Sequence, residues 1–188
     1  YPDAVQMAMK LIVDPETDFI LGVQAVGEEG VDKRIDVIAT AMAGGMTATD
    51  LIDLELSYAP QFASAKDPVN MLGYVNENRA TGENAVQWHE VETLMAEGWR
   101  LVDVRTDGEY TRGAIPGSEL VTLDELRENV DSFRGEKVIV SCRVGQRGHT
   151  AASILMQHGI EVANLDGGYL TWQMGMAATT QPELVGTP

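Results

Sequence analysis

The sequence predicts two small domains of different class. An α+β domain, with an antiparallel sheet and helices on one face, is expected over residues 1–82, and a small α/β domain with a parallel sheet over residues 83–180. Two alternating apolar segments joined by a turn open the chain, the periodic pattern breaks over residues 58–84, and strand-like and helix-like segments then alternate. The 188 residues are enough to bury two cores, and we expect residues 181–188 to form a loose tail.

The first domain is predicted to open with a β-hairpin followed by a helix. In VQMAMKLIV one face is apolar and comprises Val5, Met7, Met9, Leu11 and Val13. PETD is turn-like, and FILGVQAVG is typical of the returning strand. DKRIDVIATAMAGGM is predicted to be a helix with Asp32 as its N-cap and an apolar stripe of Ile35, Ile38, Ala39, Met42 and Met46. Thr47 and Asp50 then resemble a capping box.

Residues 58–84 are predicted to be the joint between the domains. Pro60 and Pro68 interrupt this segment, and its last part, ENRATGEN, is largely polar. We place the domain boundary near Gly82.

The second domain is predicted to alternate strands with helices. Strands are expected over residues 85–88, 100–104, 137–141 and 161–166, and helices over 90–98, 122–130 and 148–159. Gly98 is the expected stop of the first of these helices. This alternation is typical of a parallel sheet, in which ligands bind at the carboxyl ends of the strands.

Composition excludes several classes of function. The net charge of −16 makes nucleic acid and anionic membranes poor partners, and no apolar run reaches the roughly 18 residues of a membrane span. A single cysteine cannot form an internal disulfide, so we expect a reducing, cytoplasmic setting. The three histidines and the cysteine show no metal-ligand spacing, and no metal site is expected.

The only cysteine, Cys142, ends the predicted strand KVIVS and precedes the loop RVGQRG and a helix. Backbone N–H groups of a tight loop that opens a helix bind anions, and they stabilise a thiolate, which is the reactive form of cysteine. Gly145 and Gly148 give this loop conformational freedom, and Arg143 and Arg147 supply positive charge. We therefore predict that Cys142 is a nucleophile in an anion-binding loop.

Two other interpretations of Cys142 stay open from the residues alone. A free cysteine is commonly a small buried hydrophobic residue. A cysteine-dependent phosphatase needs five residues between its cysteine and its arginine, whereas four separate Cys142 from Arg147. The loop is thus one residue short for phosphate and suits a smaller cargo, such as a sulfur atom carried as a persulfide.

Residues 85–172 resemble the rhodanese (sulfurtransferase) family through DVRTDGEYTRGAIPGS, VIVSCRVGQRGHTAASILMQHG and VANLDGGYLTWQ. The resemblance implies that Cys142 accepts sulfur as a persulfide and that the loop holds it through Arg143, Val144, Gly145, Gln146, Arg147 and Gly148. It also implies that Asp103 and Arg105 tie the end of the sheet together. We further expect Arg105 to pair with Glu109, and His149 and His158 to lie on the helix surface or in packing. Ala114 stands where the family commonly has a histidine, usually a structural one.

Residues 1–73 resemble the dimerisation domain of flavin-dependent pyridine nucleotide-disulfide oxidoreductases, nearest the coenzyme A-disulfide reductases, through ILGVQAVGEEGVDKRIDVIATAM and LELSYAPQFASAKDPVN. This implies a homodimer formed through residues 1–82, with Tyr58 reaching into the partner's flavin and thiol site. The alternative for Tyr58 is that it caps a turn, and Tyr1 is a second candidate tyrosine. Lys33 and Arg34 either face coenzyme A phosphates or form a solvated face.

Together the resemblances imply sulfur transfer within a flavin-dependent coenzyme A-disulfide, persulfide or polysulfide reductase. The 188 residues contain no G-x-G-x-x-G fingerprint and no flavin-facing redox cysteine, so we expect FAD and NAD(P)H domains to precede Tyr1 and this chain alone to bind neither cofactor. The expected partners are a sulfane-sulfur donor and a thiol acceptor, with coenzyme A a candidate. The alternative is a non-catalytic module for dimerisation and recruitment of a sulfur carrier.

Overall fold

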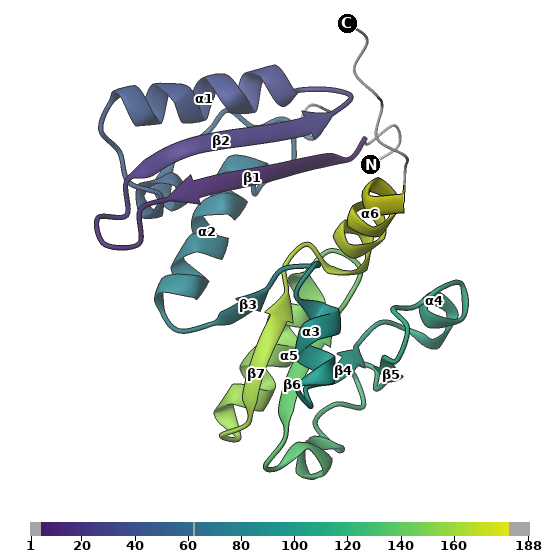
Figure 1. Cartoon of the computed structure of the whole chain (residues 1–188). Coiled ribbons are helices and arrows are strands. Elements are labelled where there is room, and N and C mark those ends of the chain that lie inside the picture. The colour runs from purple at the N-terminus through teal and green to yellow at the C-terminus, as the bar shows by residue number, and fades with distance from the viewer. Residues whose placement is uncertain (1–4, 62, 181–188) are drawn as a thin grey trace, which may run out of the picture. The chain divides into compact units, whose positions relative to one another are not determined.

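The computed structural model describes residues 5–61 and 63–180 (Figure 1). The chain divides into two compact units, Tyr1–Gly82 (unit 1) and Glu83–Pro188 (unit 2). The predicted tail, 181–188, and Tyr1 lie outside the described residues. Within the described ranges, no helix combines the length and the apolar character needed to cross a membrane.

Unit 1 begins with the predicted hairpin. Strand β1 (Met7–Val13) pairs antiparallel with β2 (Ile20–Gly27), and its side chains alternate between half-buried and exposed. The inner face meets the buried side chains of the helices that follow, in a core made of Ile20, Ile38, Ala41, Ala48, Leu51 and Val69. The predicted antiparallel sheet with helices on one face is therefore confirmed.

Helix α1 (Val31–Ala43) differs from its predicted start and stripe. It begins one residue before Asp32, after Gly30, which adopts a left-handed conformation with φ of 69°, so Asp32 lies in the first turn and is not the N-cap. Ala39 is exposed and Ala41 is buried instead, because the buried stripe passes through Arg34, Ile38 and Ala41. A short 3-10 helix, η1 (Thr49–Asp53), follows.

The predicted capping box before η1 is present. The Thr47 backbone N–H donates to the Asp50 carboxylate at 2.8 Å, and the Asp50 N–H donates to the Thr47 hydroxyl at 3.2 Å. The two bonds satisfy donors that the start of the helical segment would otherwise leave unpaired.

The prediction of an irregular joint over residues 58–84 is wrong for its second half, where helix α2 (Pro68–Ala80) forms. Asp67 is its N-cap, accepting a 3.1 Å hydrogen bond from the Val69 N–H, and Pro68 occupies the first turn. Proline fits that position because its missing N–H would have no helical partner there. Pro68 therefore starts a helix here.

Unit 2 contains a five-stranded parallel sheet in the order β3-β7-β6-β4-β5. The strands are β3 (Asn84–Val86), β4 (Arg100–Asp103), β5 (Glu119–Leu120), β6 (Lys137–Ser141) and β7 (Glu161–Leu165). β6 is the central strand, with β7 on one side and β4 on the other (Figure 1). The parallel sheet predicted for this half is confirmed.

The helices of unit 2 are α3 (Val91–Ala96), α4 (Asp107–Thr111), α5 (Gln146–Gln157) and α6 (Gly168–Thr180), with a 3-10 turn, η2 (Val130–Phe133). Successive residues of β6 contribute to two separate cores. Val138 and Val140 pack with residues of α5 and η2, whereas Ile139 packs with residues of α3 and with Trp172 of α6. The sheet is thus covered on both faces, as parallel sheets generally are.

The helix predicted over residues 122–130 is wrong. The segment forms successive turns, in which the Glu125 N–H donates to the Thr122 carbonyl and the Asn129 N–H to the Leu126 carbonyl. The Asn129 side-chain amide donates to the Glu125 carbonyl at 3.0 Å, which is the acceptor that an α-helix would offer to the Asn129 backbone. This side-chain competition is typical of asparagine and favours turns over helix.

Candidate active site

Cys142 lies where the sequence predicted, directly after the central strand β6 and before the loop that leads into α5. Loops that follow central strands of parallel sheets are the usual ligand-binding positions. Gly145 precedes α5 with φ of 100°, a conformation that side chains other than glycine resist. The loop therefore turns tightly enough to place the start of the helix next to the thiol.

The thiol of Cys142 combines burial with a polar contact. The residue is 1% exposed and packs in the core on the α5 side of the sheet, as the interpretation of a small buried residue would require. Its Sγ also accepts a hydrogen bond of 3.1 Å from the Gly145 N–H. The first intrahelical hydrogen bond of α5 runs from the His149 N–H to the Gly145 carbonyl at 2.8 Å. The N–H groups of residues 146–148 come before this bond, in the first turn, where N–H groups have no acceptor within the helix.

The start of α6 supports the other side of the Cys142 loop. The Tyr169 N–H donates to the Cys142 carbonyl at 2.7 Å, and the Leu170 N–H donates to the Arg143 carbonyl at 3.1 Å. Gly168 has φ of 60°, and a Cβ there would lie 2.5 Å from the Cys142 carbonyl oxygen. Gly168 is thus the residue that lets α6 approach the loop backbone this closely.

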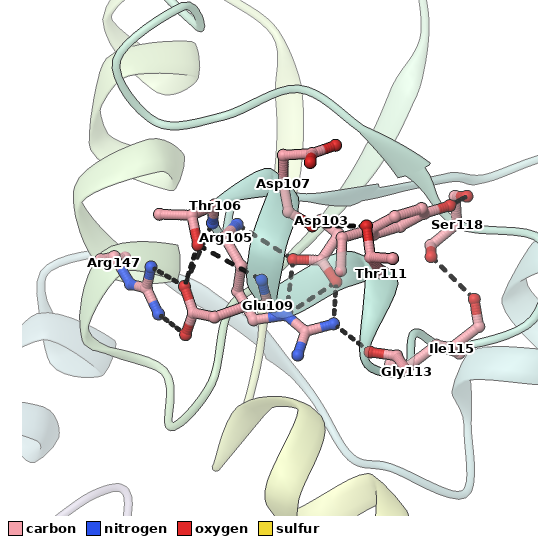
Figure 2. Close-up of polar contacts among 11 residues, drawn as sticks. Asp103, Arg105, Thr106, Asp107, Glu109, Thr111, Gly113, Ile115, Ser118 and Arg147 are labelled. Atoms are coloured by element: carbon pink, nitrogen blue, oxygen red, sulfur yellow. Dashed lines mark hydrogen bonds and ion pairs between the residues drawn. The ribbon is translucent and has the colours of Figure 1, made fainter.

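Arg147 is held by Glu109, and the predicted Arg105–Glu109 pair is wrong. The two terminal nitrogens of Arg147 each donate to one oxygen of Glu109, both at 2.7 Å (Figure 2). The hydrogen bond from Arg147 is the main cause that lowers the pKa of Glu109 to about 2, and the same bond raises the pKa of Arg147. Coulombic interactions with Cys142 and Asp103 also raise the pKa of Arg147.

Arg105 pairs with Asp103 and connects the end of β4 with the segment after α4 and with α6, as the scaffold interpretation predicted. Its guanidinium donates to Asp103 at 2.7–3.0 Å and to the Gly113 carbonyl at 2.7 Å (Figure 2). The guanidinium also lies 4.3 Å from the centre of the Tyr169 ring. Both charged side chains are almost fully buried, so the pair is part of the core and is not free to bind a ligand.

A second polar cluster lies behind the loop and was not found from the sequence. The Glu83 carboxylate contacts the His149 ring and accepts a hydrogen bond of 3.1 Å from the Asn164 side chain, which also donates to the Gly145 carbonyl at 3.2 Å. A Cβ on Gly148 would lie 2.2 Å from the Asn164 side-chain oxygen. Gly148 is therefore needed for the close packing of α5 against Asn164 of β7, and not for the conformational freedom predicted for it.

The remaining loop residues are solvent-facing. Arg143, Val144 and Gln146 are exposed, and Val144 is 53% exposed. The positive charge of Arg143 and the apolar side chain of Val144 thus lie at the outer edge of the loop. The structure places all six predicted loop residues in one segment around Cys142.

The candidates of unit 1 form no comparable nucleophilic site. Tyr58 is 54% exposed and lines a pocket of about 300 Å³ together with Lys66 and Tyr74. Lys33 is exposed, but the solvated face predicted for Arg34 is wrong, because Arg34 is buried and donates to Asp67 at 2.7 and 3.3 Å. Across the part of the chain that the structure describes, no three His, Cys, Asp or Glu side chains gather as metal ligands would.

Two family models match the chain, one in each unit. Residues 1–68 match the pyridine nucleotide-disulphide oxidoreductase dimerisation domain, and residues 87–174 match the rhodanese-like domain.

Relatives of known name match one or both units. A coenzyme A disulfide reductase of Staphylococcus aureus (strain bovine RF122 / ET3-1) is 42% identical over 74 residues, which are 39% of this chain and 17% of that protein. The crystal structure of reduced Bacillus anthracis CoADR-RHD has a TM-score of 0.91 at 43% identity, covering 95% of this chain and 32% of that one. The NAD-dependent persulfide reductase from A. fulgidus has a TM-score of 0.82 at 34% identity, covering 92% and 31%. This chain therefore spans about a third of the length of the two structures and less of the curated relative.

Proposed function

We propose that this chain, which consists of a pyridine nucleotide-disulphide oxidoreductase dimerisation domain followed by a rhodanese-like domain, transfers sulfur through a persulfide on Cys142. The observation that carries the proposal is the Gly145 N–H directed at Sγ, next to a helix start whose first N–H groups precede the helical ladder. These donors favour the thiolate and an anionic sulfur bonded to it.

The proposed reaction has two steps that balance in atoms and charge. The Cys142 thiolate attacks the outer sulfur of thiosulfate, a new S–S bond forms on Cys142, the S–S bond of thiosulfate breaks, and sulfite leaves with the bonding electron pair. The terminal sulfur of the persulfide carries one negative charge. A nucleophile such as cyanide or a thiolate then attacks that terminal sulfur and regenerates the Cys142 thiolate as leaving group.

The loop residues take distinct parts in these steps. The N–H groups of Gly145, Gln146 and Gly148 stabilise the thiolate and then the terminal sulfur, because they lie at the start of α5, where the helix dipole is positive. Arg147 lies at the same helix start, where Glu109 holds its guanidinium, and the exposed Arg143 attracts anionic donors from solvent.

The wider role that we propose is sulfur delivery within an NAD(P)H-dependent disulfide or persulfide reductase. Two of the relatives reported above are named as a coenzyme A disulfide reductase and an NAD-dependent persulfide reductase. This chain has no dinucleotide fingerprint, so FAD and NAD(P)H would be bound by other domains of such a protein, where they would supply the reducing electrons. Coenzyme A is the thiol acceptor that we propose, and Tyr58 is the residue of unit 1 that would face the partner's thiol site.

The test is thiocyanate formation from thiosulfate and cyanide. We expect the chain to form thiocyanate and Cys142→Ser to lose this activity by at least about a hundredfold, because a neutral hydroxyl is a far poorer nucleophile than a thiolate. Mass spectrometry after incubation with thiosulfate should show one added sulfur on Cys142. Equal thiocyanate rates in both proteins would contradict the catalytic role and favour the non-catalytic module, and turnover of an aryl phosphate would favour a phosphatase.

A further inference from the structure

The charge of Arg147 is matched by a carboxylate fixed opposite to it. Glu109 meets the guanidinium with both oxygens at 2.7 Å, across 38 residues of sequence (Figure 2). Such bidentate ion pairs combine charge with a defined geometry, so the guanidinium has one favoured orientation. The loop therefore does not present Arg147 as a free positive charge.

Glu109 is itself fixed from the other side. Its second oxygen accepts hydrogen bonds from the Thr106 N–H at 3.1 Å and the Thr106 hydroxyl at 3.0 Å, and the Thr106 hydroxyl accepts from the Glu109 N–H, which completes a capping box at the start of α4. The pKa of Glu109 is lowered to about 2, chiefly by the Arg147 hydrogen bond. The carboxylate is thus ionised at every pH at which the protein would work.

Other side chains around the loop also face carboxylates. Arg105 is paired with the buried Asp103, and the His149 ring contacts the Glu83 carboxylate. The exposed Arg143 lies on the solvent side of the loop. Among the described residues, Arg105 and Arg147 each face a carboxylate, so the loop is closer to neutral than its sequence indicates.

We infer that Glu109 sets the charge of the Cys142 loop, so that the loop holds the singly charged persulfide sulfur and binds sulfate and phosphate less tightly than it would with Arg147 unpaired. This inference rests on the proposed function. Glu109 acts through Arg147 and is a positioning residue, since it contacts neither Cys142 nor, in the proposed reaction, the transferred sulfur. Without its charge, Arg147 would be available to bind oxyanions that compete with the donor.

The experiment compares alkylation of Cys142 by iodoacetate, an anion, and by iodoacetamide, its neutral analogue. We expect Glu109→Gln to raise the ratio of the iodoacetate rate to the iodoacetamide rate about three- to tenfold at low salt. The reason is that the loop gains one positive charge, which favours the anionic reagent. Effects on the thiolate fraction or on opening of the loop act on both rates and cancel in the ratio. Glutamine can still complete the capping box, so the start of α4 should be retained.

Two further variants separate charge from shape. Glu109→Asp keeps the charge and should leave the ratio near that of the parent chain, and Asp107→Asn removes an exposed charge from the same helix without touching Arg147 and should change it less than about twofold. Sulfate should also slow the alkylation of Cys142 by iodoacetamide, and in Glu109→Gln it should do so at a several-fold lower concentration than in the parent chain.

The outcomes distinguish this inference from the proposed function. An unchanged alkylation ratio in Glu109→Gln, or an equal rise in Glu109→Asp, would overturn the inference even if Cys142 forms a persulfide. Conversely, a raised ratio in a chain that forms no persulfide would uphold the charge assignment to Glu109 and remove sulfur transfer.

Discussion

The contacts that stabilise unit 1 internally differ from those that stabilise unit 2. Unit 2 has a central sheet with an apolar core on each face, and its fully buried residues include Phe133, Leu126 and Leu155. Unit 1 has a two-stranded sheet with helices on one face only, and it places a charged pair, Arg34–Asp67, between α1 and the start of α2. A two-stranded sheet has little independent stability. Unit 1 therefore depends more on a few specific contacts.

Two ion pairs, Arg34–Asp67 of unit 1 and Arg147–Glu109 of unit 2, differ in their burial. Arg34–Asp67 is nearly inaccessible, with side chains 9% and 5% exposed, whereas Arg147 and Glu109 are 34% and 22% exposed. Removing one partner of a buried pair leaves a charge that nothing compensates. In a partly exposed pair, water solvates the charge that remains. The comparison indicates that Arg34–Asp67 mainly stabilises the fold, as the buried Arg105–Asp103 pair of unit 2 does, and that Arg147–Glu109 mainly adjusts the loop.

The largest expected effect is that of Asp67→Asn, which leaves Arg34 buried without its counter-charge. We expect unit 1 to lose about 3 kcal/mol of stability or more, because the Arg34 charge has no replacement partner. Asparagine is a good N-cap, so the start of α2 should be retained. Urea unfolding followed by far-UV circular dichroism on the full chain measures the loss.

The chain provides its own control for this measurement. All three tryptophans, Trp88, Trp99 and Trp172, lie in unit 2, so tryptophan fluorescence follows that unit alone. The fluorescence transition should not move in Asp67→Asn, and Asp36→Asn, an exposed charge on α1, should change either transition by less than about 0.5 kcal/mol. If Asp67→Asn shifted the urea transition of circular dichroism and that of tryptophan fluorescence equally, the assignment of the loss to unit 1 alone would be contradicted.

An intermediate effect is expected from the apolar surface of unit 1. Ile12 and Val26 lie on the outer face of the hairpin with 44% and 76% exposure, and Leu21, next to the irregularity between Ile12 and Val13, is 60% exposed. We propose that a second copy covers this surface in a homodimer, as the dimerisation-domain match favours. Val26→Glu should weaken dimerisation about tenfold or more, by burying a charge.

Light scattering across a concentration series measures this change. The mass should fall from two protomers to one in Val26→Glu, whereas Met156→Glu, a matched change on α5 of unit 2, should leave it unaltered. A single-protomer mass for the unaltered chain at micromolar concentration would refute the dimer.

The smallest expected effect concerns pH and the Arg147–Glu109 pair. The pKa of Glu109 falls from 4.5 to about 2 in the folded chain, so its stabilisation is complete above about pH 4.5 and is lost as the pH falls towards 2. Partial exposure limits the gain to about 1 kcal/mol. The stability difference between the parent chain and Glu109→Gln, followed by tryptophan fluorescence in urea, should therefore shrink between pH 6 and pH 3. A difference that stays constant over this range would contradict the assignment.

Local patterns determined much of this protein. Alternating apolar residues in β1 and the alternation of strands with helices after residue 84 predicted both sheets, and the single cysteine between a strand and a glycine-containing loop predicted the candidate site. These features depend on residues close together in the chain, whose spacing alone sets which side they face.

Tertiary structure decided the partners of the charged residues. Spacing favoured Arg105 for Glu109, but Arg105 bonds Asp103, two residues away, and Glu109 meets Arg147 across 38 residues. Likewise, the sequence left Arg34 to face coenzyme A phosphates or solvent, and Arg34 becomes buried against Asp67 only when α1 packs near α2. Long polar side chains adopt many local arrangements of similar energy, so their partners are selected only when the sheet and helices bring distant segments together.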